Sequence, residues 1–383
     1  MKKLVLVALS ASVLLATNGD SLIGLGAKSR AMGGVGIATY FGAENTLSNP
    51  ALISKGEGVE INFGATYFAP NVKANGVKSS ADKNVIPEVS LYQQINDNWT
   101  FGIGMFGSAG MGVDFRGTPS LMEARTNLLL MKFAPALSYH NNNFSIGFAP
   151  VVQYGSLDIA YNNGSPVGEG TSDNFGLGFE LGATYDITKD LRLGLIYKSK
   201  ISMTYDHTLS AASVPFSGIF GGTFKDDLDQ PAEYGAGLSY NYGYFNFSVD
   251  YKNIKWGSAK GYKDFRWSDQ DVYAIGAKYE KNDTWYGIGY NHASNPIANL
   301  PGTSAANQAL NLFNYLMFPA TAENHYSIGA GTKITKNLSL DFDIVYSPKT
   351  TVTTTVFDGT SSGSTFKVDH AETSAAFSMR YNF

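Results

Sequence analysis

Short segments in which apolar and polar side chains alternate recur along most of this 383-residue chain. The closing segment shows the pattern well: from Ala371 to Phe383 the alternate positions are almost all apolar, and the positions between them are mostly polar. Similar segments lie near 191–198, 245–252 and 338–346. Because the side chains of a β-strand point alternately to opposite faces, each segment predicts a strand with one apolar and one polar face.

The connections between these segments alternate between short turns and long loops. Turn-forming residues occupy six short connections, at 96–97, 141–143, 188–189, 242–243, 282–283 and 335–336. Seven long connections lie near 70–83, 108–127, 161–173, 207–229, 257–270, 294–322 and 349–369. Six turns and seven loops separate fourteen strands. The even number places both ends of the sheet on the side of the short turns.

The composition suggests that the apolar faces meet lipid. Charged residues make up only 16% of the chain and aromatic residues 13%, with 42 glycines. Lipid offers no hydrogen-bond partners to a backbone, so a sheet inside it must close on itself. We therefore predict an all-β fold, a 14-stranded antiparallel transmembrane β-barrel over residues 57–383, with Phe383 in the aromatic girdle at the periplasmic edge. A soluble β-sandwich or propeller would not explain so many outward aromatic side chains.

The N-terminus resembles a secretory signal peptide, which we place at residues 1–16. Lys2 and Lys3 form its basic start, and an apolar run from Leu4 to Leu15 follows. An exported barrel is expected in the outer membrane of a Gram-negative cell. The chain has no cysteine, its net charge is −4, and no run of Lys and Arg stands out in the sequence, so we expect no nucleic-acid partner.

Residues 17–56 differ from the rest of the chain because they are small, glycine-rich and only weakly periodic. Fourteen strands enclose a lumen wider than wall side chains alone can fill. We predict that this segment is a hatch that enters and plugs the lumen. The alternative, a disordered periplasmic tail, would be richer in charge and poorer in Leu, Ile and Val. Asn49, Pro50 and Ala51 are the predicted anchor of the hatch, because Asn49 can hydrogen-bond locally and Pro50 fixes the backbone.

The order of several stretches resembles one family. They are "GLGAKSRAMGGVGIA", "ENTLSNPALIS", "DQPAEYGAGLSYNY", "VDYKNIKWGS" and the closing "MRYNF". They resemble the long-chain fatty acid transporters of Gram-negative outer membranes (FadL-type), and the likeness covers nearly everything after residue 16. The resemblance implies passive uptake of fatty acids, with capture by the outer loops and transfer to a site within the barrel. It also implies sideways release into the membrane through a kink in the third strand.

The resemblance leads to expectations about partners. We expect a hydrophobic small-molecule substrate, contact with the lipid membrane and with lipopolysaccharide, and recognition of Phe383 by the barrel assembly machinery. We also expect a monomer, with no cofactor and no metal ion.

The predicted third strand concentrates glycine, which in a strand often marks a bulge or bend. Gly107, Ser108, Ala109 and Gly110 are therefore the candidates for the kink and the lateral opening. The same strand contains a G-x-G-x-x-G string, but no helix and no downstream acidic residue follow it as a nucleotide site requires, so we reject that function.

Two long loops carry apolar side chains that could capture a hydrophobic molecule. The candidates are Val214, Phe216, Ile219, Phe220, Phe224, Leu312, Phe313, Leu316, Met317 and Phe318. Alternatively these loops pack on one another and cap the barrel, and both functions can coexist. The third long loop, 161–173, is short and polar, which departs from the family, where the capture groove lies between the third and fourth loops.

Cations on the lumen face could hold a fatty acid carboxylate. The candidates are Arg125, Lys132, Lys198 and Lys200. These cations could instead pair with Glu180, Asp341 or Asp343, and the substrate would then be an uncharged aromatic or alkane hydrocarbon. A general diffusion porin is a weaker alternative.

A lipase is also rejected, and we predict no enzymatic activity. His325 and Ser327 share one face, but the alternation points both into the lumen, away from membrane lipid.

Overall fold

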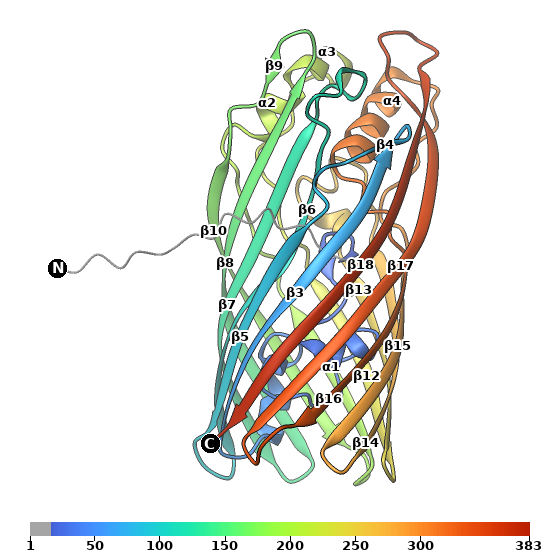
Figure 1. Ribbon diagram of the computed structural model, residues 1–383. Helices are drawn as coiled ribbons and strands as arrows, with labels where there is room; N and C mark the ends of the chain where they lie inside the picture. Colours follow the sequence, from blue (N-terminus) through green and yellow to red (C-terminus); the bar gives the residue numbers. More distant parts are fainter. Residues whose placement is uncertain (1–16) are drawn as a thin grey trace, which may run out of the picture.

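The computed structural model describes residues 17–383, so the predicted signal peptide lies outside the described residues. Antiparallel strands close into one barrel, in which the last strand, β18, pairs with the first strand of the wall, β3 (Figure 1). The described residues contain fourteen long wall strands, as predicted. They are β3 (Val59–Ala74), β5 (Asn84–Gln94), β6 (Trp99–Asp114), β7 (Arg125–Asn141), β8 (Phe144–Asn162), β10 (Ser172–Asp186), β11 (Leu191–Lys198), β12 (Glu233–Tyr242), β13 (Phe245–Ile254), β14 (Gln270–Lys281), β15 (Thr284–Ala293), β16 (Asn324–Lys333), β17 (Leu338–Val356) and β18 (Ser364–Asn382).

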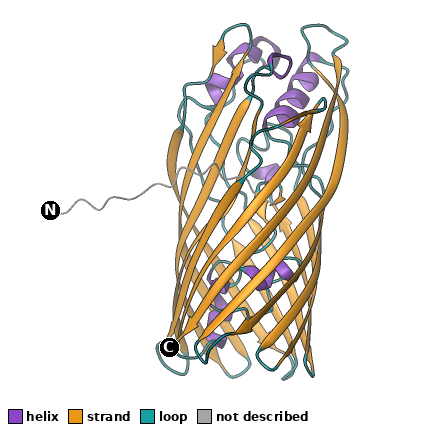
Figure 2. Cartoon of the chain, viewed as in Figure 1, coloured by secondary structure: helices purple, strands orange, loops and turns teal. Residues whose placement is uncertain are grey.

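The predicted short turns all lie between consecutive strands at one end of the barrel, and the long loops at the other end carry helices (Figure 2). The loop elements are β4 (Val77–Lys78), η3 (Pro119–Leu121), β9 (Pro166–Val167), α2 (Leu209–Ser213), η4 (Val214–Phe216), α3 (Ser217–Phe220), η5 (Trp256–Ser258), α4 (Ala305–Leu312) and the π-helix η6 (Phe313–Met317).

The last loop is shorter than predicted. Instead of spanning 349–369, it spans only 357–363, because β17 and β18 remain paired as far as Val356 and Ser364. The reason is the composition of 350–356, where only Thr and Val occur, two residue types that favour extended backbone. The two strands therefore continue beyond the last outward aromatic residues as one long hairpin.

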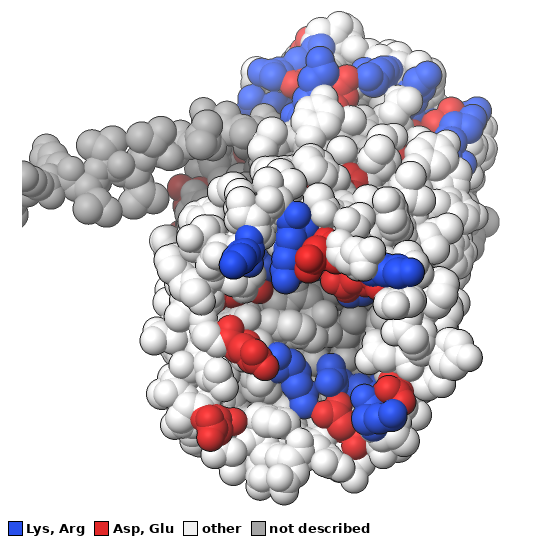
Figure 3. Space-filling model, turned by 60° about the horizontal axis from the view of Figure 1, so that its bottom comes forward, with Lys and Arg blue, Asp and Glu red and all other residues white. Residues whose placement is uncertain are grey.

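The outer surface of the barrel has an apolar belt. On β16, Tyr326 and Ile328 are 53% and 58% exposed, whereas His325 and Ser327 between them are buried in the lumen, as the alternation predicted. Figure 3, turned so that the short-turn end comes forward, shows a broad uncharged band of wall beyond the charged groups that surround the hollowed near end. The described residues include no helix with the length and hydropathy needed to cross a membrane.

The segment before β3 lies inside the barrel and is almost wholly buried (Figure 1). Its elements are β1 (Thr17–Asn18), β2 (Ser21–Leu22), α1 (Ala27–Ala31), η1 (Ala43–Thr46) and η2 (Pro50–Lys55). Buried ion pairs hold it to the wall: Arg30 Nε lies 3.3 Å from the Asp343 carboxylate, and Arg380 of β18 reaches Glu44 at 3.2 Å. Such pairs are costly to break singly, because a charge is then left buried without a partner.

The Asn49-Pro50-Ala51 turn packs directly on the wall. The Asn49 side chain accepts a hydrogen bond from the Ala51 N–H at 3.0 Å, which caps η2, and donates to the Ile37 carbonyl at 2.6 Å. A Cβ added at Gly182 of β10 would lie 1.9 Å from the Asn49 side-chain oxygen, so only glycine allows this approach. These contacts agree with the predicted anchor, whose role in holding the hatch stays a prediction.

Candidate functional site

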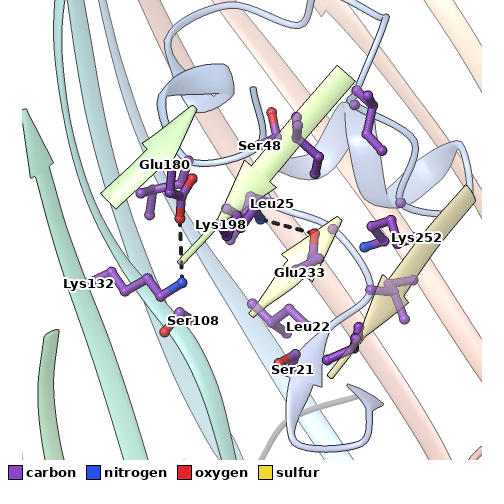
Figure 4. A pocket seen from close by; sticks show the side chains of 18 of the residues that line it. Ser21, Leu22, Leu25, Ser48, Ser108, Lys132, Glu180, Lys198, Glu233 and Lys252 are labelled. Carbon is purple, nitrogen blue, oxygen red and sulfur yellow. Dashed lines mark hydrogen bonds and ion pairs between the residues drawn. The ribbon is translucent and has the colours of Figure 1, made fainter. Parts of the chain in front are cut away.

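A cavity lies between the hatch and the wall, with about 860 Å³ of empty volume, part of it open to solvent (Figure 4). Its hatch side is mainly apolar, with Leu22, Ile23, Leu25, Ile37 and Leu47. Its wall side is charged, with side chains from β7, β10, β11, β12 and β13. These are Lys132, Glu180, Lys198, Glu233, Asp250 and Lys252. The cavity is therefore amphiphilic, with an apolar and a charged side.

Two lysines of the cavity are already paired with acids. Lys132 lies 3.5 Å from Glu180, and Lys198 lies 3.5 Å from Glu233, as the dashed lines in Figure 4 mark. Asp250 accepts hydrogen bonds from the hatch backbone. One oxygen each of Glu180 and Asp250 is buried and forms no hydrogen bond within residues 17–383. The charged side of the cavity thus holds carboxylate oxygens that could still accept a hydrogen bond from a ligand.

Lys252 differs from its neighbours because it forms no ion pair within 4.0 Å among the described residues, although it lines the cavity. It follows Asn246, Ser248 and Asp250 on the lumen face of β13, so the alternation already placed it inward. The sequence interpretation singled out other cations and missed this one. Among the described cavity lysines it is the best placed to meet an incoming anion, because the nearby Glu233 and Asp250 carboxylates form no direct ion pair with it.

The four predicted carboxylate-binding cations do not come together. Lys132 and Lys198 line the cavity, but Arg125 pairs with Asp158 and Lys200 lies 2.8 Å from Asp229, away from the cavity lining. Lys200 lies beyond β11, which ends at Lys198, so it is not on the lumen face of a wall strand as predicted.

The predicted acid partners were also only partly right. Glu180 pairs with Lys132 as the alternative required. Asp341 and Asp343 instead face Arg380 and Arg30. Arg30 belongs to the hatch, whereas Arg380 belongs to β18, and the hatch residue Lys28 also lies 4.0 Å from Asp341.

The wall has a gap beside the cavity. The β5–β6 ladder runs from Gln94 and Thr100 only to Glu88 and Phe106, and within the described chain no later pair joins the two strands. Pro87, which has no N–H to donate, directly precedes Glu88 in β5. On the other side of β6, the register with β7 shifts between Gly107 and Ala109.

The shift is a β-bulge at Ser108, inside the predicted kink. Ser108 also lines the cavity, so the cavity reaches the wall at the place where the β5–β6 ladder stops. Whether this place serves as an exit stays a prediction.

The start of the hatch fills this gap. Ser21 pairs with Ala109 of β6, and the Gly110 N–H donates to the Asp20 carbonyl at 2.9 Å. A second, smaller cavity of about 310 Å³ lies against Gly19, between residues of β3 and β6. Residues 18–22, here called the gap segment, therefore replace the missing β5 partner of β6.

The gap segment is tied to the outer loops through Asp20. Its buried carboxylate accepts hydrogen bonds from the Tyr262 hydroxyl at 2.5 Å and from Gln230 Nε2 at 2.9 Å. Burial raises the pKa of the Asp20 carboxyl above its ordinary value, and the hydrogen bonds from Tyr262 and Gln230 oppose this change. A side chain at Gly19 would collide with Trp256, because an added Cβ would lie 2.6 Å from its ring.

The predicted capture residues separate into two groups. Phe313, Leu316, Met317 and Phe318 are 5% exposed or less, so the prediction that they form exposed apolar surface is wrong. Their aromatic rings pack in a cluster with Phe224 and Phe265 that caps the lumen, because a helix with apolar side chains buries them against its neighbours.

The other capture residues keep some accessible surface. Val214 is 57% exposed, and Phe216, Ile219, Phe220, Phe224 and Leu312 are partly exposed at the edge of the cap. The apolar surface open to solvent is therefore smaller than the sequence indicated and lies mainly on 214–220. Its function in capture stays a prediction.

Comparison with known protein families shows to which family the chain belongs. Residues 7–383 match the family described as outer membrane protein transport protein (OMPP1/FadL/TodX). The chain belongs to this family. The OMPP1/FadL/TodX family consists of outer-membrane channels and not of enzymes, which confirms the predicted family, location and lack of enzymatic function.

Individual relatives are distant. The chain is 26% identical over 204 residues to a long-chain fatty acid transport protein of Escherichia coli O6:H1, and the match spans 43% of this chain and about half, 46%, of that relative. It is 23% identical over 431 residues to outer membrane protein P1 of Haemophilus influenzae, spanning 90% of each chain.

Solved structures of the OMPP1/FadL/TodX fold superpose well. A Pseudomonas aeruginosa FadL homologue gives a TM-score of 0.74 with 16% identity, covering 95% of this chain and all of that one. The Pseudomonas putida toluene transporter TodX gives 0.70 with 19% identity, covering 94% and 99%. At these identities the likeness establishes the fold. The family match adds that the chain is an outer membrane transport protein and leaves its substrate open.

Proposed function

We propose that this channel passively takes up long-chain fatty acids or similar amphiphiles and releases them sideways into the outer membrane. The amphiphilic cavity carries the proposal. Its apolar hatch side suits a hydrocarbon chain, and Lys252 with Lys132 and Lys198 suits a carboxylate.

The charge of the cavity favours an amphiphile over a plain hydrocarbon. A hydrocarbon would cover Lys252 and the buried oxygens of Glu180 and Asp250 without offering them a hydrogen bond. A carboxylate would satisfy Lys252 and offer its other oxygen to Lys132 or Lys198, which line the same cavity. The same cavity would therefore bind a fatty acid more tightly than an alkane of equal length.

Entry is proposed at the outer loops. The partly exposed apolar residues of 214–220 lie at the edge of the aromatic cap and could hold an apolar chain before it passes inward. No energy source is required, because an apolar substrate gains free energy by moving from water into lipid.

Release is proposed through the gap between β5 and β6. The cavity touches this gap at Ser108, and the gap segment closes it through one strand pair and the Asp20 hydrogen bonds. Movement of the gap segment would expose the cavity to the membrane without removal of the whole hatch, which its ion pairs with the wall hold in place.

An uncharged aromatic or alkane substrate is the second candidate. It is favoured by the pairing of Lys132, Lys198, Lys200 and Arg125 with acids, which leaves little free positive charge. The P. putida relative of this fold is described as a toluene transporter. A general diffusion porin is disfavoured, because the buried hatch occupies the lumen.

Substitution of Lys252 separates the two candidates. In cells that depend on this channel for uptake, Lys252→Met should lower uptake of labelled oleate at least about fivefold, because it removes one charge-assisted hydrogen bond. Uptake of toluene should not change. The matched control is Lys263→Met, which removes an exposed outer-loop lysine. Unchanged oleate uptake in Lys252→Met, or toluene uptake without oleate uptake in the wild type, would contradict the fatty acid assignment.

A further inference from the structure

Three lysines gather on the outside of the barrel wall, at the end that carries the long loops. They are Lys73 on β3, Lys349 on β17 and Lys367 on β18, here called the lysine cluster. Strands β17, β18 and β3 are consecutive in the wall, so residues far apart in the sequence become neighbours. The sequence showed no run of basic residues because the cluster forms only when the last strands pair with the first.

The lysine cluster is short of negative charge. Asp369 lies 3.9 Å from Lys349 and 3.6 Å from Lys367, and it pairs in register with Lys73 across the β18–β3 ladder. Within residues 17–383, Asp369 is the acid that forms ion pairs with the cluster, and Lys73 forms none. Two ammonium groups thus share one carboxylate and a third lysine lies on the neighbouring strand, which leaves two positive charges uncompensated.

The cluster also faces sideways and not into the lumen. On β18, Val368 and His370 point inward and are buried, whereas Lys367 between Phe366 and Val368 is 51% exposed. Lys349 is 60% exposed. Figure 3 shows charged side chains of both signs at the far end of the wall, beyond the uncharged band. A partner of the cluster would therefore lie beside the barrel.

The height of the cluster matches the polar border of a bilayer. Tyr346 on β17 and Tyr67 on β3 are outward aromatic residues of the belt, and Lys349 and Lys73 follow them by three and six residues. At about 3.3 Å per residue along a tilted strand, the lysines lie roughly 10–20 Å further along the wall. Aromatic belts mark the interface, so the lysines lie at the level of lipid phosphates.

Other parts of the wall are different at this end. On β10, Asp173 accepts a hydrogen bond from Tyr154, and on β14, Asp271 accepts one from Tyr251. These outward positions carry acids, which would repel phosphate. At these two places the rim therefore lacks the excess positive charge of the β17–β18–β3 sector.

We propose that the lysine cluster binds the phosphate groups of a phosphorylated lipid of the outer leaflet, with the chemistry of lipid A. Its chains would lie on the apolar belt of β17, β18 and β3, and its phosphates would accept charge-assisted hydrogen bonds from the lysines. This site is separate from the proposed substrate route, and its test does not depend on the substrate.

Binding of purified lipid A to the whole delipidated barrel in a neutral detergent tests the site. Tryptophan fluorescence or thermal unfolding would be followed as bis-phosphorylated lipid A is added. The triple variant Lys73→Gln, Lys349→Gln, Lys367→Gln should bind at least about tenfold more weakly than the wild type. The matched control replaces Lys225, Lys263 and Lys336 with Gln, which removes the same charge from exposed positions elsewhere and should bind like the wild type.

Two further arms identify the ligand. Lipid A without phosphates should bind the wild type at least about tenfold more weakly, and inorganic phosphate at the same concentration should give no shift. Equal binding by the cluster variant and the control, or equal affinity for dephosphorylated lipid A, would overturn the proposal. A full shift with inorganic phosphate alone would also overturn it, because the site would then need no lipid. Heat-resistant migration on a gel confirms that each variant is folded.

Discussion

Two junctions in the barrel wall differ sharply. Where the chain ends meet, β18 and β3 pair without interruption over fifteen positions, from Val368 with Ala74 to Asn382 with Glu60. Between β5 and β6, early in the chain, the ladder stops after seven positions and the gap segment fills the remaining space. The junction that closes the barrel is thus complete, while an internal hairpin is left open. The opening is a local property of β5 and β6, because β5 pairs with only part of the length of β6. It does not come from weak closure of the whole sheet.

The comparison matters because backbone groups inside lipid must be paired. At the complete junction the strands satisfy each other, so that region has no reason to move. At the open junction, the gap segment supplies some of the backbone partners that β6 does not find in β5. These are the residue pair Ser21 and Ala109 and one hydrogen bond from the Gly110 N–H. A short segment that is held by few contacts can leave at a far lower cost in free energy than a full strand.

The largest expected effect comes from fixing the gap segment to β6. Ser21→Cys with Ala109→Cys places a cysteine pair at register partners in a chain that has no other cysteine, and partners in such pairs are close enough for a disulfide. Oxidation should lower oleate uptake at least about tenfold, because the gap segment can no longer withdraw. Reduction should restore it.

The control for this pair lies at the complete junction. Thr66→Cys with Ala376→Cys joins register partners of β3 and β18, and its oxidation should leave uptake unchanged. If the control pair blocks uptake as strongly as the gap pair, the two junctions do not differ in function. If the oxidised gap pair transports at the wild-type rate, release does not pass the gap segment.

A smaller effect is expected from weakening the Asp20 tether. Tyr262→Phe removes the hydroxyl that donates to Asp20 at 2.5 Å and leaves the buried carboxylate with one donor fewer, at a cost of about 1–3 kcal/mol to the closed form. Release of oleate from preloaded vesicles should become severalfold faster. Tyr251→Phe, which removes an exposed hydroxyl that donates to Asp271, should have no effect. Slower release in Tyr262→Phe would show that the tether does not hold the gap closed.

The smallest effect concerns pH. Because burial raises the pKa of Asp20 in the closed form, that form takes up a proton more readily than an open form in which Asp20 is in water. As the pH falls through the raised pKa toward the ordinary value of 3.8, the closed form is stabilised and release should slow, by about two- to threefold. The groups that face Asp20 are Tyr262, Gln230, Ser21 and, through space, Lys132.

Asp20→Asn is the control for this pH dependence, because Asn cannot ionise yet can accept the same hydrogen bonds. Release through this variant should be independent of pH over the same range. An identical pH profile in the variant and the wild type would assign the titration to another group.

The sequence predicted the wall well because lipid imposes a strict rule on it. Alternation fixed which side chains face outward, as Tyr326 and His325 show, and glycines marked the bulge at Ser108. The length of the last hairpin was wrong, because Thr and Val alone do not reveal where a strand leaves the membrane. The alternation of β13 predicted that Lys252 faces the lumen, but Lys252 was not named as a candidate. Its lack of an ion pair can be recognised only in the structure.

Contacts between distant segments could not be predicted. Asp20 and Tyr262 are 242 positions apart, and neither carries a local pattern that points to the other. The sequence around Phe313 and Phe318 does not show whether these side chains face water or pack in a cap. Their burial depends on how the outer loops fold against one another. The lysine cluster likewise arises only from the pairing of β18 with β3.

The central claim is that a fatty acid passes through the cavity and leaves the barrel between β5 and β6. A fatty acid with a photoreactive group at the end of its chain, irradiated during uptake and located by peptide mass spectrometry, tests it most directly. The account predicts labels on β6 at 107–113 and on the gap segment, with few on the β3 and β18 residues of the complete junction. Labels confined to the β18–β3 junction, or spread evenly around the lumen as in a central pore, would contradict it.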